Sequence, residues 1–299
     1  MLLRQLHQEI AGILKDAGIG EPRREAALLL AHFLDLPLAA LYARPEQPVD
    51  SEVVRCVSLA AARRADHVPM AYILGETGFA GLTFAVGPGV LVPRPDSEIL
   101  VETAFQIAAS IRRTGCADAE RPAAAPLMIL DACAGTGCVG ISLAVRLRQA
   151  GYPVSLWLTD IDPQAAAYAR RNLVRHGLNA AATLEIADLW PQDRRLGWDL
   201  VVANPPYIRQ SLIPELMPEV SRYEPPAALD GGPDGLDVLR RLTHEAADRL
   251  NPGGCLLLEH GYDQAKSVAA LILAAGRYDL IPAVRDYGGR PRVSGGWRK

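Results

Sequence analysis

The residues best suited to chemistry stand in the tetrapeptide Asn204-Pro205-Pro206-Tyr207, which follows an almost entirely apolar run at 198–203. Two consecutive prolines fix φ and remove two backbone donors, so the carbonyl of Pro205 is left free to accept a hydrogen bond. The Asn204 side chain offers a second acceptor, and Tyr207 offers a flat ring. Two acceptors beside a ring can hold a planar group that carries an NH2, such as an amide or a nucleobase amine. The alternative is a proline-rich turn capped by Asn204.

The apolar run predicts where this tetrapeptide lies. Short, nearly continuous apolar segments are typical of strands buried in a parallel sheet. Open α/β sheets bind their ligands outside the carboxyl ends of such strands. We therefore expect the four residues to lie at the ligand-binding edge of a sheet.

A second group of residues forms a glycine-containing turn, Asp131-Ala132-Cys133-Ala134-Gly135-Thr136-Gly137, between a predicted strand and a predicted helix. Glycines let the backbone approach a ligand closely, and the free N–H groups of the following helix favour an anionic group. Residues 135–140 match G-x-G-x-x-G, and Asp160 follows about 20 residues later. The pattern permits a dinucleotide site, although this fingerprint alone is weak.

Two aspartates follow the next predicted strands. Asp160 ends the second strand, and we expect it to accept hydrogen bonds from ribose hydroxyls. Asp188 ends the third strand and would accept a hydrogen bond from an adenine amino group, with Leu189 covering the ring. Each aspartate could instead cap a helix or turn. Asp162, the competing carboxylate, precedes Pro163 and resembles an N-cap.

Alternating strand and helix patterns after residue 126 predict an α/β fold with a doubly wound, mostly parallel, seven-stranded sheet. The predicted strands are 127–131, 154–160, 183–188, 198–203, 255–259, 278–285 and 290–294. The predicted helices run to about residue 147 and over 163–176, 236–250 and 263–275, with a turn at 251–254.

The first 75 residues have helical periodicity and predict a small bundle, with Asp50 as one N-cap. The numbers of acidic and basic residues in this segment are nearly equal, which disfavours nucleic-acid binding and favours contact with a protein. Residues 76–95 predict a glycine-punctuated β-hairpin that links this domain to a second one at 96–299. Asp96 is the expected N-cap of the next helix, and 112–126 is the expected surface loop.

Composition restricts the class of protein. The chain is 49% hydrophobic and 22% charged, and it has no apolar run of membrane-spanning length and no signal-peptide core, so we expect a cytoplasmic protein. A net charge of −3 argues against affinity that comes from neutralising many phosphates. The five cysteines contain no Cys-x-x-Cys pair, and neither they nor the histidines predict a metal site or a disulfide framework.

The chemical groups of the tetrapeptide help to distinguish between two possible cofactors. A nicotinamide enzyme needs an acid or base beside its hydride site, whereas residues 204–207 offer only acceptors and a ring. S-adenosylmethionine carries a methyl already activated by its sulfonium, so a protein need only hold the attacking nitrogen in line with it. This comparison favours S-adenosylmethionine and leaves an NAD-dependent oxidoreductase as the remote alternative. Glu259 and His260 could together act as a general base, but their place at a strand end favours a structural role.

Over nearly its whole length the chain resembles the release factor glutamine methyltransferases, the PrmC/HemK family of class I S-adenosylmethionine-dependent methyltransferases. The Asn-Pro-Pro-Tyr tetrapeptide alone is shared with adenine methyltransferases that act on DNA or RNA, whereas the other segments are more specific. The resemblance is carried mainly by Val90-Leu91-Val92-Pro93-Arg94-Pro95-Asp96-Ser97-Glu98, Asn204-Pro205-Pro206-Tyr207-Ile208, Tyr223-Glu224-Pro225 and Leu258-Glu259-His260-Gly261.

The resemblance implies methylation of the side-chain amide nitrogen of the glutamine in the Gly-Gly-Gln segment of class I peptide chain release factors. These release factors would be the partners, with no membrane and no direct nucleic-acid binding; a ribosomal-protein glutamine or nucleic-acid adenine methyltransferase is the alternative. Residues 1–75 would recognise the substrate, residues 133–137 with Asp160 would bind the cofactor, and Asn204 to Tyr207 would hold the glutamine. Asp188, Leu189 and Asn204 would flank the adenine and the methyl group.

Three residues depart from the family pattern. Cys133 and Ala134 stand where a run of alternating glycines is usual, and Leu189 stands where an aromatic residue is often found. The first departure could reduce backbone contact with the cofactor, and the second could weaken adenine stacking.

Overall fold

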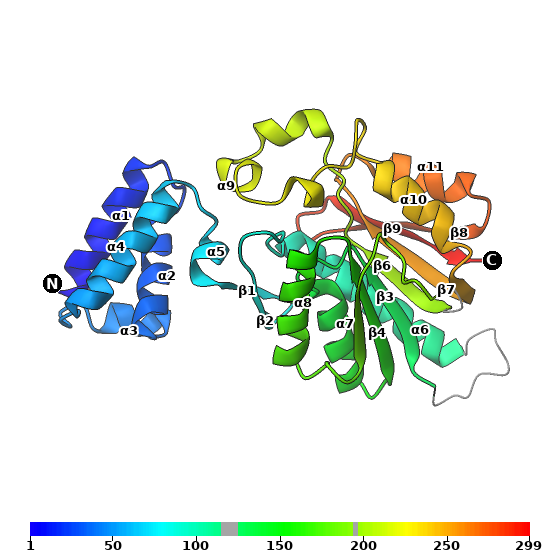
Figure 1. Ribbon diagram of the computed structural model, residues 1–299, viewed down its shortest axis with the longest axis horizontal. Helices are drawn as coiled ribbons and strands as arrows, with labels where there is room; N and C mark the ends of the chain where they lie inside the picture. Colours follow the sequence, from blue (N-terminus) through cyan, green and yellow to red (C-terminus); the bar gives the residue numbers. More distant parts are fainter. Residues whose placement is uncertain (115–124, 194–196) are drawn as a thin grey trace. The chain divides into compact units, whose positions relative to one another are not determined.

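The computed structural model describes residues 1–114, 125–193 and 197–299, which form two compact units (Figure 1). The first unit contains Met1–Glu76 and the short segment Met217–Tyr223. The second contains Thr77–Leu216 and Glu224–Lys299.

The first unit is helical, as the periodicity predicts. Leu6, Ile10 and Leu14 recur on one face of the first helix, and all three are fully buried. The Asp50 side chain accepts a hydrogen bond from the Glu52 amide at 2.8 Å, which confirms it as an N-cap. The helices are α1 (Leu3–Asp16), α2 (Pro22–Leu34), α3 (Leu38–Ala43), α4 (Ser51–Ala65), α5 (Met70–Leu74) and α9 (Pro218–Ser221).

A buried arginine joins segment 217–223 to the rest of this unit. Arg64 is 6% exposed, and its guanidinium lies 2.5 Å from the Glu25 carboxylate and 2.7 Å from the Glu219 carboxylate. Nearby, the Tyr223 hydroxyl donates to the Asp66 carbonyl at 2.7 Å. Two carboxylates thus compensate the one buried guanidinium.

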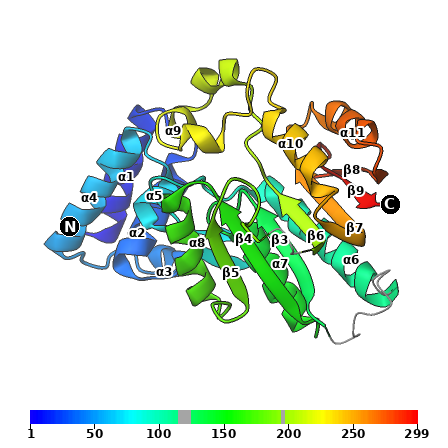
Figure 2. The same ribbon diagram turned by 45° about the vertical axis from the view of Figure 1, so that its right-hand side comes forward.

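The second unit is built on a seven-stranded sheet in the order β5-β4-β3-β6-β7-β9-β8. The strands from β5 to β7 are parallel, and β9 is antiparallel to both of its neighbours (Figure 2). This order confirms the predicted doubly wound, mostly parallel sheet. The strands are β3 (Leu127–Ala132), β4 (Val154–Asp160), β5 (Ala182–Ile186), β6 (Trp198–Ala203), β7 (Leu250–Glu259), β8 (Tyr278–Arg285) and β9 (Pro291–Arg298).

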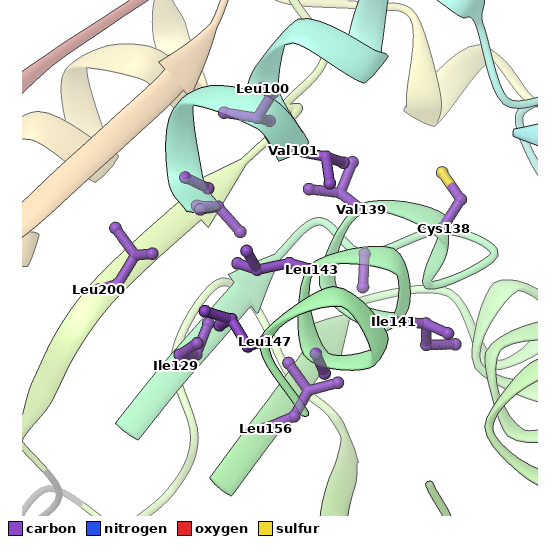
Figure 3. Close-up of a cluster of buried hydrophobic side chains, with 14 of the residues drawn as sticks. Leu100, Val101, Ile129, Cys138, Val139, Ile141, Leu143, Leu147, Leu156 and Leu200 are labelled. Carbon is purple, nitrogen blue, oxygen red and sulfur yellow. The ribbon is translucent and has the colours of Figure 1, made fainter. Parts of the chain in front are cut away.

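Helices cover both faces of this sheet. On one face, Leu100 and Leu143 pack with Ile129 and Leu200 of the strands (Figure 3). The neighbouring strand residues, such as Val201, contribute instead to a cluster on the other face. Alternation between two apolar faces is the pattern of a strand that is buried on both sides. The first face is covered by α6 (Glu98–Thr114), α7 (Cys138–Gln149) and α8 (Pro163–Arg175), and the other by α10 (Asp237–Ala246) and α11 (Ala265–Ala274).

The predicted hairpin forms a separate two-stranded sheet of β1 (Glu76–Phe79) and β2 (Leu82–Ala85). Phe79 and Phe84 are almost fully buried and meet edge to face, with ring centroids 6.1 Å apart. Both rings belong to the same apolar cluster as α6 and α7.

Several predicted boundaries were wrong. The predicted turn at 251–254 lies within β7. Trp198 pairs with Leu250 while Leu200 pairs with Cys255, so the pairing register shifts between these two positions and the intervening residues of β7 have no partner on β6. Helix α10 ends at Ala246, and β5 ends at Ile186, so Asp188 lies beyond its strand. Helix α6 continues to Thr114, and residues 115–124 of the predicted surface loop lie outside the described residues.

Asp96 is also not an N-cap. The segment Pro95–Ser97 forms a short 3-10 helix, η1, whose N-cap is Arg94. The Asp96 carboxylate instead lies 2.6 Å from the Arg292 guanidinium. An ion pair with β9 therefore takes the carboxylate that a local cap would have used.

The long connection after β6 is only partly irregular. It contains the 3-10 helices η2 (Gln210–Glu215) and η3 (Pro226–Ala228), with α9 between them. No helix in the described part of the chain combines the length and the apolar character needed to cross a membrane.

Candidate active site

A cavity of about 340 Å³ opens at the carboxyl ends of β3, β4 and β6. Its volume falls within the range of small-molecule pockets, about 300–1,000 Å³. Gly137, Pro205 and Tyr207 stand beside it but are not part of its lining. The predicted residues that do line it are Cys133, Ala134, Gly135, Thr136, Asp160, Asp188, Leu189, Asn204 and Pro206.

The glycine turn brings backbone to this cavity. Gly135 and Gly137 have φ of 56° and 77°, a left-handed conformation that glycine adopts without strain. Cys133 has φ of 58° although it carries a Cβ, which accounts for the usual preference for glycine at such a position. Gly137 is the N-cap of α7, so the positive end of that helix follows directly.

Asp160 holds the turn while it lines the cavity. One carboxylate oxygen accepts from the Gly135 amide at 2.7 Å, and the other accepts from the Asp162 amide at 2.9 Å. Burial raises the pKa of Asp160, and these hydrogen bonds oppose the rise. Asp162 itself accepts from the Gln164 amide at 2.7 Å, which confirms it as the N-cap of α8.

Asp131 is a cavity residue that sequence reasoning did not single out. It is 1% exposed at the end of β3, and it accepts from the Gly140 amide at 2.7 Å. Burial raises its pKa to about 7. A Cβ on Gly140 would stand 2.8 Å from the carboxylate, so glycine is required there. The sequence feature that could have identified Asp131 as a site residue was its position at the end of a predicted strand, where the glycine turn begins.

Asp188 has a partner that the sequence did not reveal. Its carboxylate forms two hydrogen bonds with the Arg241 guanidinium, at 3.1 and 3.0 Å, from 53 residues away in the chain. The adjacent Leu189 is 5% exposed, and its carbonyl accepts from the Thr159 hydroxyl at 2.6 Å. Leu189 thus presents a fixed apolar wall to the cavity.

Asn204 follows β6 directly and lines the same cavity. Its Nδ2 donates to the Ser97 Oγ at 3.1 Å, so Oδ1 is left as the acceptor of this side chain. Pro205 is buried. Within the described residues, no backbone N–H of a turn or loop donates a hydrogen bond to its carbonyl. The site therefore combines a side-chain acceptor with a backbone acceptor.

Glu259 lies behind the tetrapeptide. It is 1% exposed, and its Oε1 accepts from the Tyr207 hydroxyl at 3.4 Å. Burial raises the pKa of Glu259 to about 7, opposed by hydrogen bonding from Ser97, the charge of Arg292 and hydrogen bonding from Tyr207.

His260 is not paired with Glu259. Its Nδ1 lies 2.8 Å from the Gly261 carbonyl, and its Nε2 lies 2.9 Å from the Ser294 hydroxyl. Burial lowers the pKa of His260, so the ring favours the neutral form. These contacts are those of a structural histidine.

The cavity fits S-adenosylmethionine. The glycine turn and the α7 N-terminus suit its carboxylate, Asp160 suits its ribose, and Leu189 suits the face of its adenine. The Thr136 hydroxyl is buried and, within the described chain, has no hydrogen-bond partner. A polar ligand group would satisfy this otherwise costly atom.

The chain matches known sequences over both halves. Residues 5–75 match the PrmC N-terminal domain, and residues 122–217 match the methyltransferase small domain. The "Release factor glutamine methyltransferase" of Geobacter sulfurreducens is 38% identical over 98% of this chain and 96% of its own length. The protein of that name from Moorella thermoacetica is 38% identical over 100% of this chain and 99% of its own.

Among solved structures, the catalytic domain of hMettl16 in complex with the MAT2A 3′UTR hairpin 6 has a TM-score of 0.54 at 13% identity, covering 84% of this chain and 82% of that one. This likeness concerns the fold alone. The full-length identity to the two bacterial relatives is of a different kind, because it spans the helical segment, the glycine turn and the tetrapeptide together. By that identity, this chain belongs to the release factor glutamine methyltransferase family.

Proposed function

We propose that the protein transfers a methyl group from S-adenosylmethionine to the side-chain amide nitrogen of the glutamine in the Gly-Gly-Gln segment of class I peptide chain release factors. The observation that carries this proposal is the position of Asn204. It lines the same cavity as Asp160 and the glycine turn, with its Nδ2 bound to Ser97 and its Oδ1 left to accept.

A neutral amide nitrogen is a poor nucleophile because its lone pair is delocalised into the carbonyl. Hydrogen bonds from the substrate NH2 to Asn204 Oδ1 and to the Pro205 carbonyl would oppose that delocalisation and stabilise positive charge on nitrogen. Pro206 and Tyr207 would pack against the plane of the substrate amide. When bound, S-adenosylmethionine supplies a methyl group that its sulfonium has already activated.

No base with a perturbed pKa is required at the cavity wall for this transfer. The surplus proton of the methylated nitrogen can pass to an acceptor or to water after the transfer. The role of the site is therefore to hold and orient the amide, which matches a set of fixed acceptors.

The family membership decides against the NAD-dependent oxidoreductase alternative. We further propose that residues 1–75 recognise the release factor, residues 76–95 link the two domains and residues 96–299 carry the catalysis. The net charge of −3 supports a protein partner in preference to a nucleic acid and fits a cytoplasmic enzyme of translation.

The proposal is tested with the full chain and labelled S-adenosylmethionine. A release factor, its variant with alanine in place of the Gly-Gly-Gln glutamine, a ribosomal protein and DNA are incubated separately. We expect label on the release factor only, located on that glutamine by mass spectrometry. Label on the ribosomal protein or on DNA, with none on the release factor, would refute this substrate.

A further inference from the structure

A buried glutamine from another part of the chain contacts the last residue of the tetrapeptide. Gln264, the N-cap residue of α11, is 5% exposed and is not part of the cavity lining. Its Nε2 donates to the Tyr207 carbonyl at 2.9 Å and to the Gly235 carbonyl at 3.1 Å, and its Oε1 accepts from the Gly261 amide at 2.8 Å. One side chain therefore joins the loops after β6, before α10 and after β7.

The partners of Gln264 fix the orientation of its amide. The Gly261 N–H can only donate and the two carbonyls can only accept, so the glutamine oxygen must face Gly261 and its nitrogen must face the carbonyls. Reversal would place the oxygen against two acceptors and leave buried groups without partners. Within the described residues, no backbone N–H of a turn or loop donates to the Tyr207 carbonyl, so Gln264 supplies the hydrogen bond of that carbonyl.

The loop before α10 leaves no room for a side chain at this contact. The φ of Gly235 is 76°, and a Cβ there would collide with the Tyr207 carbonyl oxygen and lie 2.6 Å from Gln264 Nε2. A Cβ on Gly231 would lie 2.8 Å from the Tyr207 Cα. Glycine at both positions lets this loop pack directly against the backbone of Tyr207.

The tetrapeptide is a short, stiff segment between two fixed ends. At one end, Asn204 follows β6, which pairs with β3 and with β7. At the other end, Gln264 holds the Tyr207 carbonyl. Pro205 and Pro206 have fixed φ between these ends, so the direction of the Pro205 carbonyl depends on where both ends lie.

We propose that Gln264 is a positioning residue, which acts through Tyr207 to hold the Pro205 carbonyl and the Tyr207 ring where the substrate amide binds. This inference rests on the proposed function for its effect on turnover. The hydrogen bond between Gln264 and Tyr207 does not depend on the identity of the substrate, so it can be measured separately.

The kinetic test uses the full chain with labelled S-adenosylmethionine and a release factor. Gln264→Met keeps the length of the side chain and removes all three hydrogen bonds. It should lower kcat about 10- to 100-fold, because a small displacement of the groups that orient a substrate has a cost of that order. Calorimetry should give nearly the parental affinity for S-adenosylmethionine, since neither Gln264 nor Tyr207 lines the cavity. The calorimetric stoichiometry gives the folded fraction, to which kcat is normalised.

A pair of glycine variants tests the same contact without removing the glutamine. Gly235→Ala places a Cβ against Gln264 and Tyr207 and should lower kcat by a similar factor. The matched control is Gly276→Ala, because Gly276 has a similar φ of 67° but nothing within 4 Å of the added Cβ. The control carries the same backbone strain and should leave kcat within about twofold. Equal kcat in the two variants would contradict the role of the contact, and this pair decides the question if Gln264→Met does not fold.

A spectroscopic readout needs no substrate. Protein labelled with ¹³C at the tyrosine carbonyls and with ¹⁵N at isoleucine gives carbonyl–amide correlations only for Tyr-Ile pairs, which are Tyr72-Ile73 and Tyr207-Ile208 in this sequence. The signal that vanishes in Tyr207→Phe belongs to Tyr207. Loss of the hydrogen bond in Gln264→Met should move this signal upfield, while the Tyr72 signal stays in place as the internal reference.

The two readouts distinguish failure of the inference from failure of the proposed substrate. An unmoved Tyr207 signal in Gln264→Met would overturn the inference, as would parental kcat in that variant. A parent chain that does not methylate release factors would refute the proposed substrate, and the Tyr207 signal would still decide whether Gln264 holds the tetrapeptide.

Discussion

The carboxylate of Glu224 lies 2.6 Å from the guanidinium of Arg94, across 130 positions of the chain. The Glu224 side chain is 1% exposed, whereas Arg94 reaches the surface and also lines the cavity. The next residue, Pro225, lines the same cavity. This ion pair therefore connects the Pro-Arg-Pro segment to the Tyr-Glu-Pro segment at the rim of the site.

Arg94→Ala should lower the free energy of unfolding by about 1–3 kcal/mol, because a buried carboxylate loses a charged partner. It should also weaken S-adenosylmethionine binding, because Arg94 itself lines the cavity and its ion-pair partner precedes Pro225, another lining residue. Denaturant unfolding and calorimetry measure the two effects. The control is Arg277→Ala, which breaks an exposed pair with Asp248 and should cost less than about 1 kcal/mol. Equal losses in the two variants would show that the burial of Glu224 has no effect.

Asn204→Ala should remove most turnover while leaving the affinity for S-adenosylmethionine only moderately changed. We expect kcat to fall about 100-fold or more, because one of the two acceptors for the substrate amide is lost. Single-turnover methylation and calorimetry separate the two quantities. Near-normal turnover would exclude Asn204 from the role proposed for it.

The Asp131 carboxyl predicts a pH dependence of stability. Its pKa is raised from 3.8 to about 7 in the folded chain, so between these values the folded protein keeps a proton that the unfolded chain has lost. Its contribution to stability is therefore fully present below about pH 4 and is lost as the pH rises to about 7.

The pH dependence is measured against Asp131→Asn, which cannot ionise. Between pH 4 and 7, the parent chain should lose about 2–4 kcal/mol of unfolding free energy relative to that variant. Asp248→Asn is the control. Arg277 lowers the pKa of Asp248 below its usual 3.8, so the effect of its titration on stability lies mainly below pH 4. A constant difference between the parent chain and Asp131→Asn would contradict the raised pKa.

The left-handed backbone at Cys133 predicts a stabilising substitution. Cys133→Gly should be about 0.5–1 kcal/mol more stable than Cys133→Ala, because only glycine removes the Cβ that is strained at φ of 58°. The alanine variant controls for loss of the sulfur, and thermal unfolding compares the two. Greater stability of the alanine variant would mean that the surrounding turn tolerates the Cβ without strain.

Elements with strong local patterns could be predicted from the sequence. The near-continuous apolar run at 198–203 became β6, and Asp50 and Asp162 became caps, because period and capping depend on residues a few positions apart. The prediction for Asp96 was wrong because Arg292, far along the chain, takes its carboxylate. The turn predicted at 251–254 was wrong because those residues lie within β7, at a shift in its pairing register with β6.

For the site, the order of residue types along the chain was enough to identify the glycine turn, Asp160 and Asn204 as neighbours, because the carboxyl ends of parallel strands meet at one edge. The partners of these residues were decided only by the tertiary structure. Ser97 reaches Asn204, Arg241 reaches Asp188 and Glu224 reaches Arg94 across long separations in the chain. Such contacts, and the burial that raises the pKa of Asp131, depend on strand register and on how deeply each side chain is enclosed, which no local pattern of residues encodes.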